Sequence, residues 1–416
     1  MWFYRLIIKL YWIFARTISP VNSKACRFVK GRKNLFYQLK GNIPEDKPVI
    51  WFHCASLGEF EQARPLIEAW KERFPRDFIL LTFFSPSGYE VRKDYKLAGY
   101  VSYLPMDTKK NARQFIEIVN PSIVIFIKYE FWLHYIDILH RKDIPIYLVS
   151  GIFRKKQHFF QWYGGIFRKR LHKFRHFFVQ NNTSSALLDS LGISRHTLSG
   201  DTRFDRVSAI SRNAPSFTEL EAFCKGALVI VAGSSWPPDE KLFTEQLTRQ
   251  AGPKLKIIFA PHQVEQTHIR QLIRRLPEET LLWSRINSMQ TDKANILIID
   301  TIGILPFIYQ YADIAYIGGG FGKGIHNTLE AATYNIPVVF GPHYRQFREA
   351  KDLINKGGAF SINNRSSFNS CMENLIHDNQ HRLHAGKIAG NYIKANTGAT
   401  SLIMETLLMS GKKKNH

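Results

Sequence analysis

The chain has 416 residues, of which 45% are hydrophobic, and it contains no low-complexity tract. This length is too great for one ordinary core and predicts two domains of about 200 residues each. Four scattered cysteines without a CxxC pair argue against a disulfide framework or a zinc site. The formal net charge of +23 predicts an anionic partner, which can be nucleic acid, an acidic membrane surface or a phosphorylated substrate.

Large apolar and aromatic side chains dominate residues 1–18, although Arg5, Lys9 and Arg16 interrupt them. A helix would place these cations along one face and apolar side chains on the other, which is typical of a helix lying in a membrane interface. We therefore predict a membrane-anchoring or interfacial helix at residues 1–20. A shallow, tilted span and a helix packed on its own domain are the alternatives.

Apolar, β-prone segments then alternate with amphipathic segments, which predicts βαβ units and a parallel sheet. We assign residues 21–205 to this first, Rossmann-like domain. Its expected strands lie at 49–55, 78–85, 100–105, 122–130, 144–150 and 176–180.

Glu59 follows the strand at 49–55 through the turn Ser56-Leu57-Gly58 and begins a helix. Ligands of open α/β sheets bind at the carboxyl ends of the strands, where a carboxylate could take a proton from an attacking hydroxyl. However, Ser56-x-x-Glu59 is also a capping box, in which both side chains bond the backbone of the first helical turn. The local pattern alone favours the capping role.

Glu130 ends the apolar strand Ile123–Ile127 and could face Glu59 across a cleft, or it could be a solvated residue at a helix start. Basic and aromatic residues alternate over 153–175, which suits a membrane interface or single-stranded nucleic acid. A helix with core aromatics and a solvated basic face is the structural alternative.

Periodicity is lost over residues 199–216, and Arg203 lies at the start of this stretch. We predict an interdomain linker at 206–216. A second Rossmann-like domain is predicted at 217–385, followed by a C-terminal helix and basic tail at 386–416. Such a tail can hold an anionic membrane weakly, although most are simply solvated. Strands of the second domain are expected at 227–233, 255–260, 294–300, 313–317 and 336–340.

The predicted strands of the second domain run into small or polar turns. The last turn opens GGGFGKGIHNTLE, in which glycines allow close backbone approach and Asn327 begins a helix whose N-terminus favours phosphate. Asn327-x-x-Glu330 could be only a cap, but with the glycine loop it is more typical of a nucleotide site. No Walker lysine loop, GxGxxG placement or histidine metal motif is present, so no metal or other cofactor is predicted.

Seven motifs occur in the order seen in the transferases of Kdo (3-deoxy-manno-octulosonic acid) in lipopolysaccharide synthesis, and the chain from about residue 45 resembles that family. The resemblance implies a GT-B glycosyltransferase fold with two Rossmann-like parallel-sheet domains. It also implies transfer of Kdo from CMP-Kdo to the lipid A precursor at the cytoplasmic face of the inner membrane. The motifs are WFHCASLGEFE, KYEFW, SGDTRFD, VAGSS, FAPHQ, DTIGIL and GGGFGKGIHNTLEAATYNIPVVFGP.

By this resemblance Glu59 is the general base, while Glu130 and Arg203 stabilise the transition state. The family commonly has Lys where Arg203 stands, which keeps the cation but changes its geometry. His262 replaces a frequent Arg, and a neutral imidazole is a weaker anion ligand. The implied CMP-binding residues are Ser234, Pro261, His262, Gly303, Ile304, Leu305, Asn327, Thr328, Leu329 and Glu330.

Three other functions fit parts of the sequence. Another GT-B enzyme acting on a membrane lipid would prefer UDP to CMP. A nucleic-acid-binding protein would bind with a steep salt dependence and without lipid, although none is expected here. For a non-catalytic membrane adaptor, Glu59→Gln would be silent.

Overall fold

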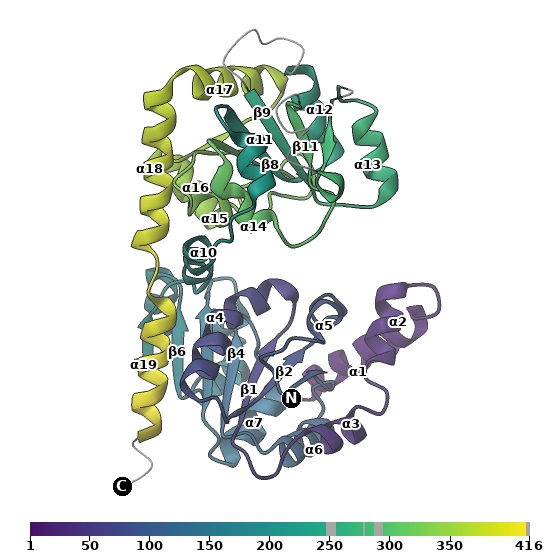
Figure 1. The fold of residues 1–416 in the computed structure, drawn as a ribbon. Helices are drawn as coiled ribbons and strands as arrows, with labels where there is room; N and C mark the ends of the chain where they lie inside the picture. The colour runs from purple at the N-terminus through teal and green to yellow at the C-terminus, as the bar shows by residue number, and fades with distance from the viewer. Residues whose placement is uncertain (247–254, 278, 287–293, 413–416) are drawn as a thin grey trace. The chain divides into compact units, whose positions relative to one another are not determined.

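The computed structural model describes residues 1–246, 255–277, 279–286 and 294–412. The chain forms two compact units (Figure 1). The first comprises Met1–Arg206 with Thr397–His416, and the second comprises Val207–Asn396. Each unit contains a seven-stranded sheet, so the prediction of an α/β protein with two sheet domains is confirmed.

The sheet of the first unit is parallel, with strand order β3-β2-β1-β4-β5-β6-β7. All six residues of β1 are buried, as expected where helices cover both faces of a sheet. Since side chains alternate along a strand, Trp51 packs into one core cluster, whereas Ile50 and Phe52 pack into another. The strands are β1 (Val49–Cys54), β2 (Phe78–Phe83), β3 (Tyr100–Tyr103), β4 (Ile123–Ile127), β5 (Ile146–Gly151), β6 (His176–Val179) and β7 (His196–Leu198).

The helix predicted after Glu59 is α4, which buries the expected face with Phe60, Ala63, Ile67 and Trp70. The other helices complete the layers around this sheet. They are α1 (Trp2–Ile18), α2 (Ser23–Lys30), α3 (Leu35–Asn42), α4 (Leu57–Arg73), α5 (Pro86–Arg92), α6 (Lys109–Val119), α7 (Leu133–Arg141), η1 (His158–Phe160), α8 (Gly165–Leu171), α9 (Asn182–Asp189), α10 (Arg203–Arg212) and α19 (Ala399–Lys412).

The second sheet is also parallel, in the order β10-β11-β9-β8-β12-β13-β14. Its strands are β8 (Leu228–Ser235), β9 (Leu255–Pro261), β10 (Leu281–Leu282), β11 (Ile296–Ile298), β12 (Ile314–Ile317), β13 (Val338–Phe340) and β14 (Ala359–Ser361). The helices of this unit are α11 (Thr218–Cys224), α12 (Pro237–Gln246), α13 (Gln266–Ile273), η2 (Trp283–Arg285), α14 (Leu305–Ile308), η4 (Tyr309–Tyr311), α15 (Leu329–Ala332), α16 (Arg348–Lys356), α17 (Arg365–His377) and α18 (Asn379–Ala395).

The two units differ from the predicted domains in two places. The segment expected to be an irregular linker is helical over α10, and the division between the units falls inside that helix, at Arg206. The C-terminal segment is split, since α18 lies in the second unit and α19 belongs to the first. Ile403, Met404 and Leu407 of α19 are buried in the core cluster that contains Phe60 of α4. Residues 413–416, which include most of the predicted basic tail, lie outside the described residues.

The segment at 153–175 mostly follows its structural alternative. Phe153, Phe159 and Phe174 are buried in the core, and Arg170 and Lys173 pair with Asp137. The alternation of basic and aromatic residues therefore mainly reflects packing, although neighbouring aromatic side chains on this segment are exposed.

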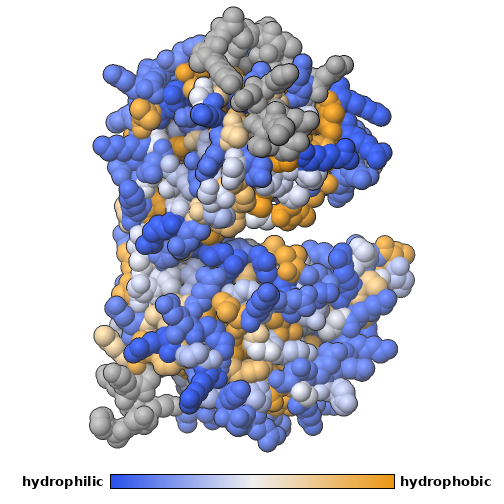
Figure 2. Space-filling view, viewed as in Figure 1, coloured by the Kyte–Doolittle hydropathy of each residue, from blue (hydrophilic) through white to orange (hydrophobic). Residues whose placement is uncertain are grey.

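Helix α1 forms as predicted and packs through one face that includes Tyr4, Ile8, Trp12 and Ala15. Except for the half-buried Ile18, the remaining apolar side chains of the helix are exposed. Within the residues that the structure describes, no helix is long and apolar enough to cross a membrane. In the view of Figure 2, hydrophilic residues cover most of both units, with apolar patches among them.

Candidate active site at the carboxyl edge of the first sheet

Glu59 lies in the first turn of α4, directly after the carboxyl end of β1, and its residue is 9% exposed. Its carboxylate accepts a hydrogen bond from the backbone N–H of Ala55. The Ser56 side chain makes no capping bond, so the predicted capping box is only half present. Glu59 is therefore a buried acid at a sheet edge as well as a partial cap.

Glu130 follows β4 through a sharp turn in which Lys128 adopts a left-handed backbone conformation, with φ of 66°. The carboxylate is buried and accepts from Trp132 Nε1 at 2.6 Å, and His53 Nε2 lies 2.9 Å away. Burial and two ring partners rule out the alternative of a solvated residue at a helix start. Helix α7 begins only at Leu133.

His53 of β1 connects Glu130 to the sheet and was not predicted as a site residue. Its side chain is fully buried, and Nδ1 lies 2.8 Å from Thr82 Oγ1 of β2. The indole N–H of Trp51 donates to the same Thr82 oxygen at 2.7 Å. Because the Thr82 oxygen accepts a hydrogen bond from Trp51, the Thr82 hydroxyl can itself donate to Nδ1 of His53. His53 then carries its ring proton on Nε2 and donates it in a hydrogen bond to Glu130. Three adjacent strands thereby fix the position of the Glu130 carboxylate.

The environment of Glu59 raises the pKa of its carboxyl to about 8. Burial is the largest cause, and the charge of Glu130 adds to it. The backbone N–H of Ala55 and the charge of Lys128 act in the opposite direction. A carboxylate with a pKa near the working pH is a stronger base than an ordinary glutamate. The two predicted acids are thus electrostatically coupled in one site.

Arg203 begins α10 and pairs with the buried Asp201, with NH2 2.8 Å and Nε 2.9 Å from Asp201 Oδ2. Burial opposes ionisation of Asp201, but Arg203 outweighs it and lowers the pKa of this carboxyl. Lys128 acts electrostatically on both Asp201 and Glu59. The structure therefore brings Arg203 into the region of Glu59, and adds Asp201 and Lys128, which were missed although both lie in the quoted motifs.

The predicted nucleotide-binding residues lie in loops at the carboxyl ends of the second unit's strands. Ser234 is the penultimate residue of β8 and has φ of 51°, Pro261 ends β9, and residues 303–305 follow β11. Asn327 Nδ2 donates to Glu330 Oε1 at 2.9 Å. Helix α15 contains only four residues, so the predicted helix N-terminus is a weaker phosphate site than expected.

Three rings form a stack in the same loops. The His262 ring stacks on the rings of both Trp236 and His326, with centroids 4.7 Å and 4.4 Å away. Trp236 Nε1 donates to His326 Nε2 at 3.1 Å. Burial and the neighbouring His262 lower the pKa of His326 to about 4, and burial also lowers the pKa of His262. Both imidazoles are therefore neutral at pH 7. Trp236 and His326 were not predicted as site residues.

The glycine-rich loop is held by Asp239, which accepts from the Gly319 N–H at 2.9 Å and the Tyr316 hydroxyl at 2.7 Å. A Cβ atom on Gly318 would lie 2.2 Å from the Ser234 carbonyl oxygen. Only glycine can therefore occupy this position between the loops that follow β8 and β12. Within the described ranges, no group of three His, Cys, Asp or Glu side chains has metal-binding geometry.

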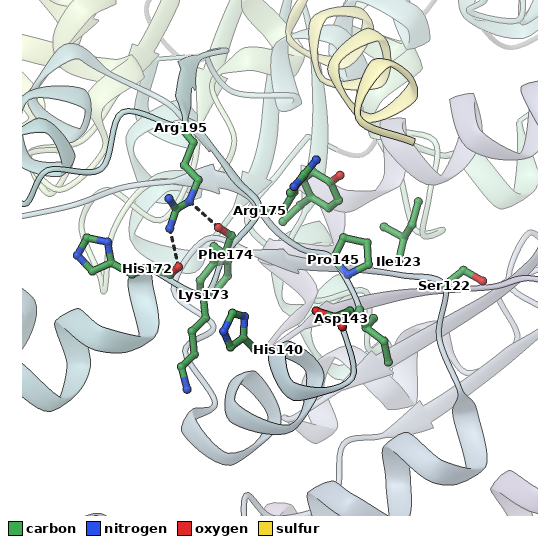
Figure 3. Close-up of a pocket in the computed structure, with 12 residues that line it drawn as sticks. Ser122, Ile123, His140, Asp143, Pro145, His172, Lys173, Phe174, Arg175 and Arg195 are labelled. Atoms are coloured by element: carbon green, nitrogen blue, oxygen red, sulfur yellow. Dashed lines mark hydrogen bonds between the residues drawn. The ribbon is translucent and has the colours of Figure 1, made fainter. Parts of the chain in front are cut away.

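Figure 3 shows a separate cavity of about 820 Å³ in the first unit. Its lining residues include Ile123, Pro145 and Arg175, which precede or begin β4, β5 and β6. Arg195 turns toward the backbone, where it donates to the carbonyl oxygens of Phe174 and His172 at 2.7 Å and 2.5 Å. This cavity lies at the amino edge of the sheet, opposite the edge that carries Glu59.

The chain resembles one family of known proteins, through a family model that matches the first unit and through relatives that match most of the chain. A family model described as "3-Deoxy-D-manno-octulosonic-acid transferase (kdotransferase)" matches residues 29–206. The 3-deoxy-D-manno-octulosonic acid transferase of Chlamydia trachomatis serovar D is 27% identical over 352 residues, covering 81% of this chain and 80% of the relative. The transferase of the same name from Haemophilus influenzae is 23% identical over 383 residues, covering 89% of both chains.

Solved structures show the same architecture. A UDP-GlcNAc 2-epimerase from Neisseria meningitidis, bound to UDP-GlcNAc, aligns with a TM-score of 0.58 at 15% identity, covering 87% of this chain and all of the epimerase. MurG from Acinetobacter baumannii aligns with a TM-score of 0.54 at 13% identity, covering 87% of this chain and 99% of that chain. At these identities the likeness concerns the fold, which is of the GT-B class.

Proposed function

Since the chain belongs to the family of 3-deoxy-D-manno-octulosonic-acid transferases, we propose that it moves Kdo from CMP-Kdo to a hydroxyl of the lipid A precursor, lipid IVA. Transfer inverts the anomeric centre and uses Glu59 as general base. The observation that carries this proposal is the coupled, buried pair of Glu59 and Glu130 at the carboxyl edge of the first sheet.

In the proposed reaction, Glu59 removes the proton of the acceptor hydroxyl as its oxygen bonds to the anomeric carbon of Kdo. The bond between that carbon and the CMP phosphate oxygen breaks, and CMP leaves with the electron pair. Attack from the face opposite CMP inverts the centre. The raised pKa of Glu59, about 8, supports this role because it increases the proton affinity of the carboxylate.

Glu130 and Arg203 assist in different ways. The negative charge of Glu130 favours a proton on Glu59, so it promotes deprotonation of the acceptor. Arg203 is a cation oriented by Asp201, and it suits an anionic group of the substrate as charge develops in the transition state.

For the donor, we assign the CMP site to the loops of the second unit that carry Ser234, Pro261, His262, residues 303–305 and residues 327–330. Close-packed glycines and the ordered Asn327–Glu330 pair support a ligand close to the backbone. Glu330 accepts from Asn327 and retains capacity to accept from ribose hydroxyls. The neutral His262 and His326 supply N–H donors but no fixed charge.

We further propose that the enzyme works on an anionic membrane surface, at the cytoplasmic face of the inner membrane. The net charge of +23 and the exposed apolar side chains of α1 support this assignment. They include Trp2, Phe3, Leu10, Ile13 and Phe14, each more than half exposed. Residues of this kind insert among lipid headgroups, while Lys and Arg bind the anionic surface.

The test incubates purified protein with radiolabelled CMP-Kdo and lipid IVA in detergent. We expect labelled lipid from the wild type and from Glu61→Gln, a half-exposed carboxylate on the same helix. Glu59→Gln should remain folded and bind CMP but lose at least 100-fold in kcat, since positioned bases contribute about 10²–10⁴-fold. Equal rates for the two variants would return Glu59 to a capping role. Transfer only from UDP-sugars would identify another GT-B enzyme.

A further inference from the structure

A mainly apolar cavity of about 320 Å³ lies in the first unit between α1, α2 and the loop from β2 to α5. A methylene group is about the size of a water molecule, whose share of liquid volume is about 30 Å³, so the cavity can hold roughly ten methylene groups. Its lining residues are Tyr11, Phe14, Ala15, Ile18, Asn22, Lys24, Ala25, Phe28, Phe84, Ser85 and Pro86.

The inner wall of this cavity is rigidly built. The rings of Phe28 and Phe84 meet edge to face at 5.2 Å, and Tyr11 contacts both. Arg32 lies behind them, with its guanidinium 3.8 Å from the Phe28 ring centroid and bonded to the carbonyl oxygens of Phe84, Leu104 and Phe28. The cavity therefore has a fixed aromatic wall rather than loosely packed side chains.

The same wall leads directly to the candidate active site. Phe84 contacts Trp132 with ring centroids 4.6 Å apart, and Trp132 donates to the Glu130 carboxylate. Because Phe84 follows β2, this part of the cavity lining lies at the carboxyl edge of the sheet, the edge that carries Glu59. The cavity lining thus contacts a hydrogen-bonded partner of Glu130 directly, through Phe84 and Trp132.

The mouth of the cavity combines apolar and cationic groups. Phe14 lines it and is 61% exposed, and it continues into the exposed apolar surface of α1. Lys24 is the cation of the lining, and its side chain is exposed on α2. An occupant with an apolar chain and an anionic headgroup would match both features.

We propose that this cavity binds one acyl chain of the lipid acceptor and thereby positions the acceptor headgroup at Glu59. This inference rests on the proposed function and adds a binding subsite to it. An acceptor chain explains the position of the cavity better than a bulk phospholipid chain does, because its inner wall contacts Trp132 beside the catalytic carboxylates. The exposed Lys24 of the lining suits a phosphate of that acceptor.

The first experiment compares Phe14→Asp with Phe3→Asp, which makes the same change at an equally exposed position of α1 outside the cavity lining. Rates are measured in mixed micelles with lipid IVA and with its deacylated headgroup. With lipid IVA, we expect Phe14→Asp to lower kcat/KM at least tenfold relative to Phe3→Asp. With the deacylated acceptor, the two variants should be equal. Equal values with lipid IVA would overturn the proposal.

A second variant, Ala25→Leu, partly fills the cavity from α2. Acceptors with progressively shorter acyl chains should recover its rate, whereas the wild type should prefer the longer chains. A parallel shift in both proteins would argue against a chain in this cavity. Circular dichroism and CMP binding check that each variant is folded.

A binding measurement separates failure of the subsite from failure of the proposed function. Lipid IVA with a diazirine at an acyl terminus is irradiated with the wild-type protein, with and without excess phosphatidylglycerol. We expect crosslinks in α1, α2 and residues 84–86 that phosphatidylglycerol does not displace. Transfer activity without such crosslinks would refute the subsite alone. Loss of the crosslinks to phosphatidylglycerol would identify a general lipid site and overturn the assignment to the acceptor.

Discussion

His53 Nε2 lies 2.9 Å from Glu130 Oε2, and both side chains are buried at the carboxyl edge of the first sheet. The pair joins β1 to the turn after β4, so the position of one proposed active-site acid depends on a histidine 77 residues earlier. Trp132 is the second donor to the same oxygen. The geometry of the proposed active site therefore depends on a strand residue, His53, as well as on residues that follow the strands.

Replacing His53 tests this dependence. His53→Phe keeps a ring at this position but removes one buried hydrogen-bond partner from Glu130 and one from Thr82, which should lower the free energy of unfolding by about 2 kcal/mol. We also expect kcat to fall at least tenfold, which corresponds to about 1.4 kcal/mol in the barrier. Urea unfolding and transfer rates measure the two effects. His172→Phe, at an exposed position of the same unit, is the control.

The raised pKa of Glu59 predicts how the rate depends on pH. A general base must be deprotonated, so kcat/KM should rise with pH to a plateau, with an apparent midpoint near pH 8. Glu130→Gln removes the neighbouring charge that raises this pKa and should move the midpoint to lower pH. Measuring kcat/KM of both proteins across pH 5–10 tests this prediction. An unchanged midpoint in Glu130→Gln would contradict the effect of the Glu130 charge on the pKa of Glu59.

The free energy of unfolding should also depend on pH, and the contribution of Glu59 to it should fall as pH rises. The folded pKa of Glu59, about 8, lies above its ordinary value of 4.5, so between these values the folded state binds the extra proton. The contribution of Glu59 to stability therefore falls as pH rises through this window. Glu59→Gln should remove that decline and be more stable than the wild type at pH 8.5. Thermal unfolding at pH 6 and 8.5 compares them, with Glu61→Gln as the control.

Arg203 should require its charge more than its shape. Arg203→Gln should lower kcat about 100-fold if this cation stabilises the transition state. Arg203→Lys should retain most of the activity, since it keeps the charge beside Asp201 although the two-nitrogen contact is lost. Single-turnover rates distinguish this result from a binding defect. Equal losses in the two variants would assign the residue to geometry instead of charge.

His262 sets the expected affinity for CMP. The imidazole is neutral at pH 7, so His262→Arg should introduce a charge-assisted hydrogen bond to phosphate and tighten CMP binding about tenfold. Calorimetry at two salt concentrations should show the gain shrinking with salt. Cytidine without phosphate should bind both proteins equally. Tighter cytidine binding would place His262 beside the nucleoside.

Much of this fold can be predicted from strand and helix periods. The buried run at 49–54 and the apolar face of α4 are local signals, and they correctly place Glu59 after a strand. The strands β7, β10 and β14 were missed because each contains only two or three residues, too few to show a period. The buried face of α19 can be predicted from its apolar residues, but the sequence does not indicate that its partner is α4.

The site was predicted less completely than the fold. Glu130 follows an apolar strand in the sequence, and this pattern was enough to predict its position at the carboxyl edge of the sheet. Its contact with His53 depends on strand order, because the β1–β4 pairing brings His53 to Glu130 while the β1–β2 pairing brings His53 to Thr82. A histidine within an otherwise apolar strand was the available signal. The Trp236–His262–His326 stack joins three separate loops, and no local pattern predicts such a contact.

The packing of α19 has a consequence for synthesis of the chain. Ile403, Met404 and Leu407 complete the core beside Phe60, Leu66 and Trp70, yet about 330 residues separate these partners along the chain. A ribosome makes the N-terminal part first, so one apolar face of α4 stays uncovered until the whole second unit has been translated. The first unit can therefore complete this core only after the second unit has been made, and until then the nascent chain exposes an apolar face that chaperones can bind.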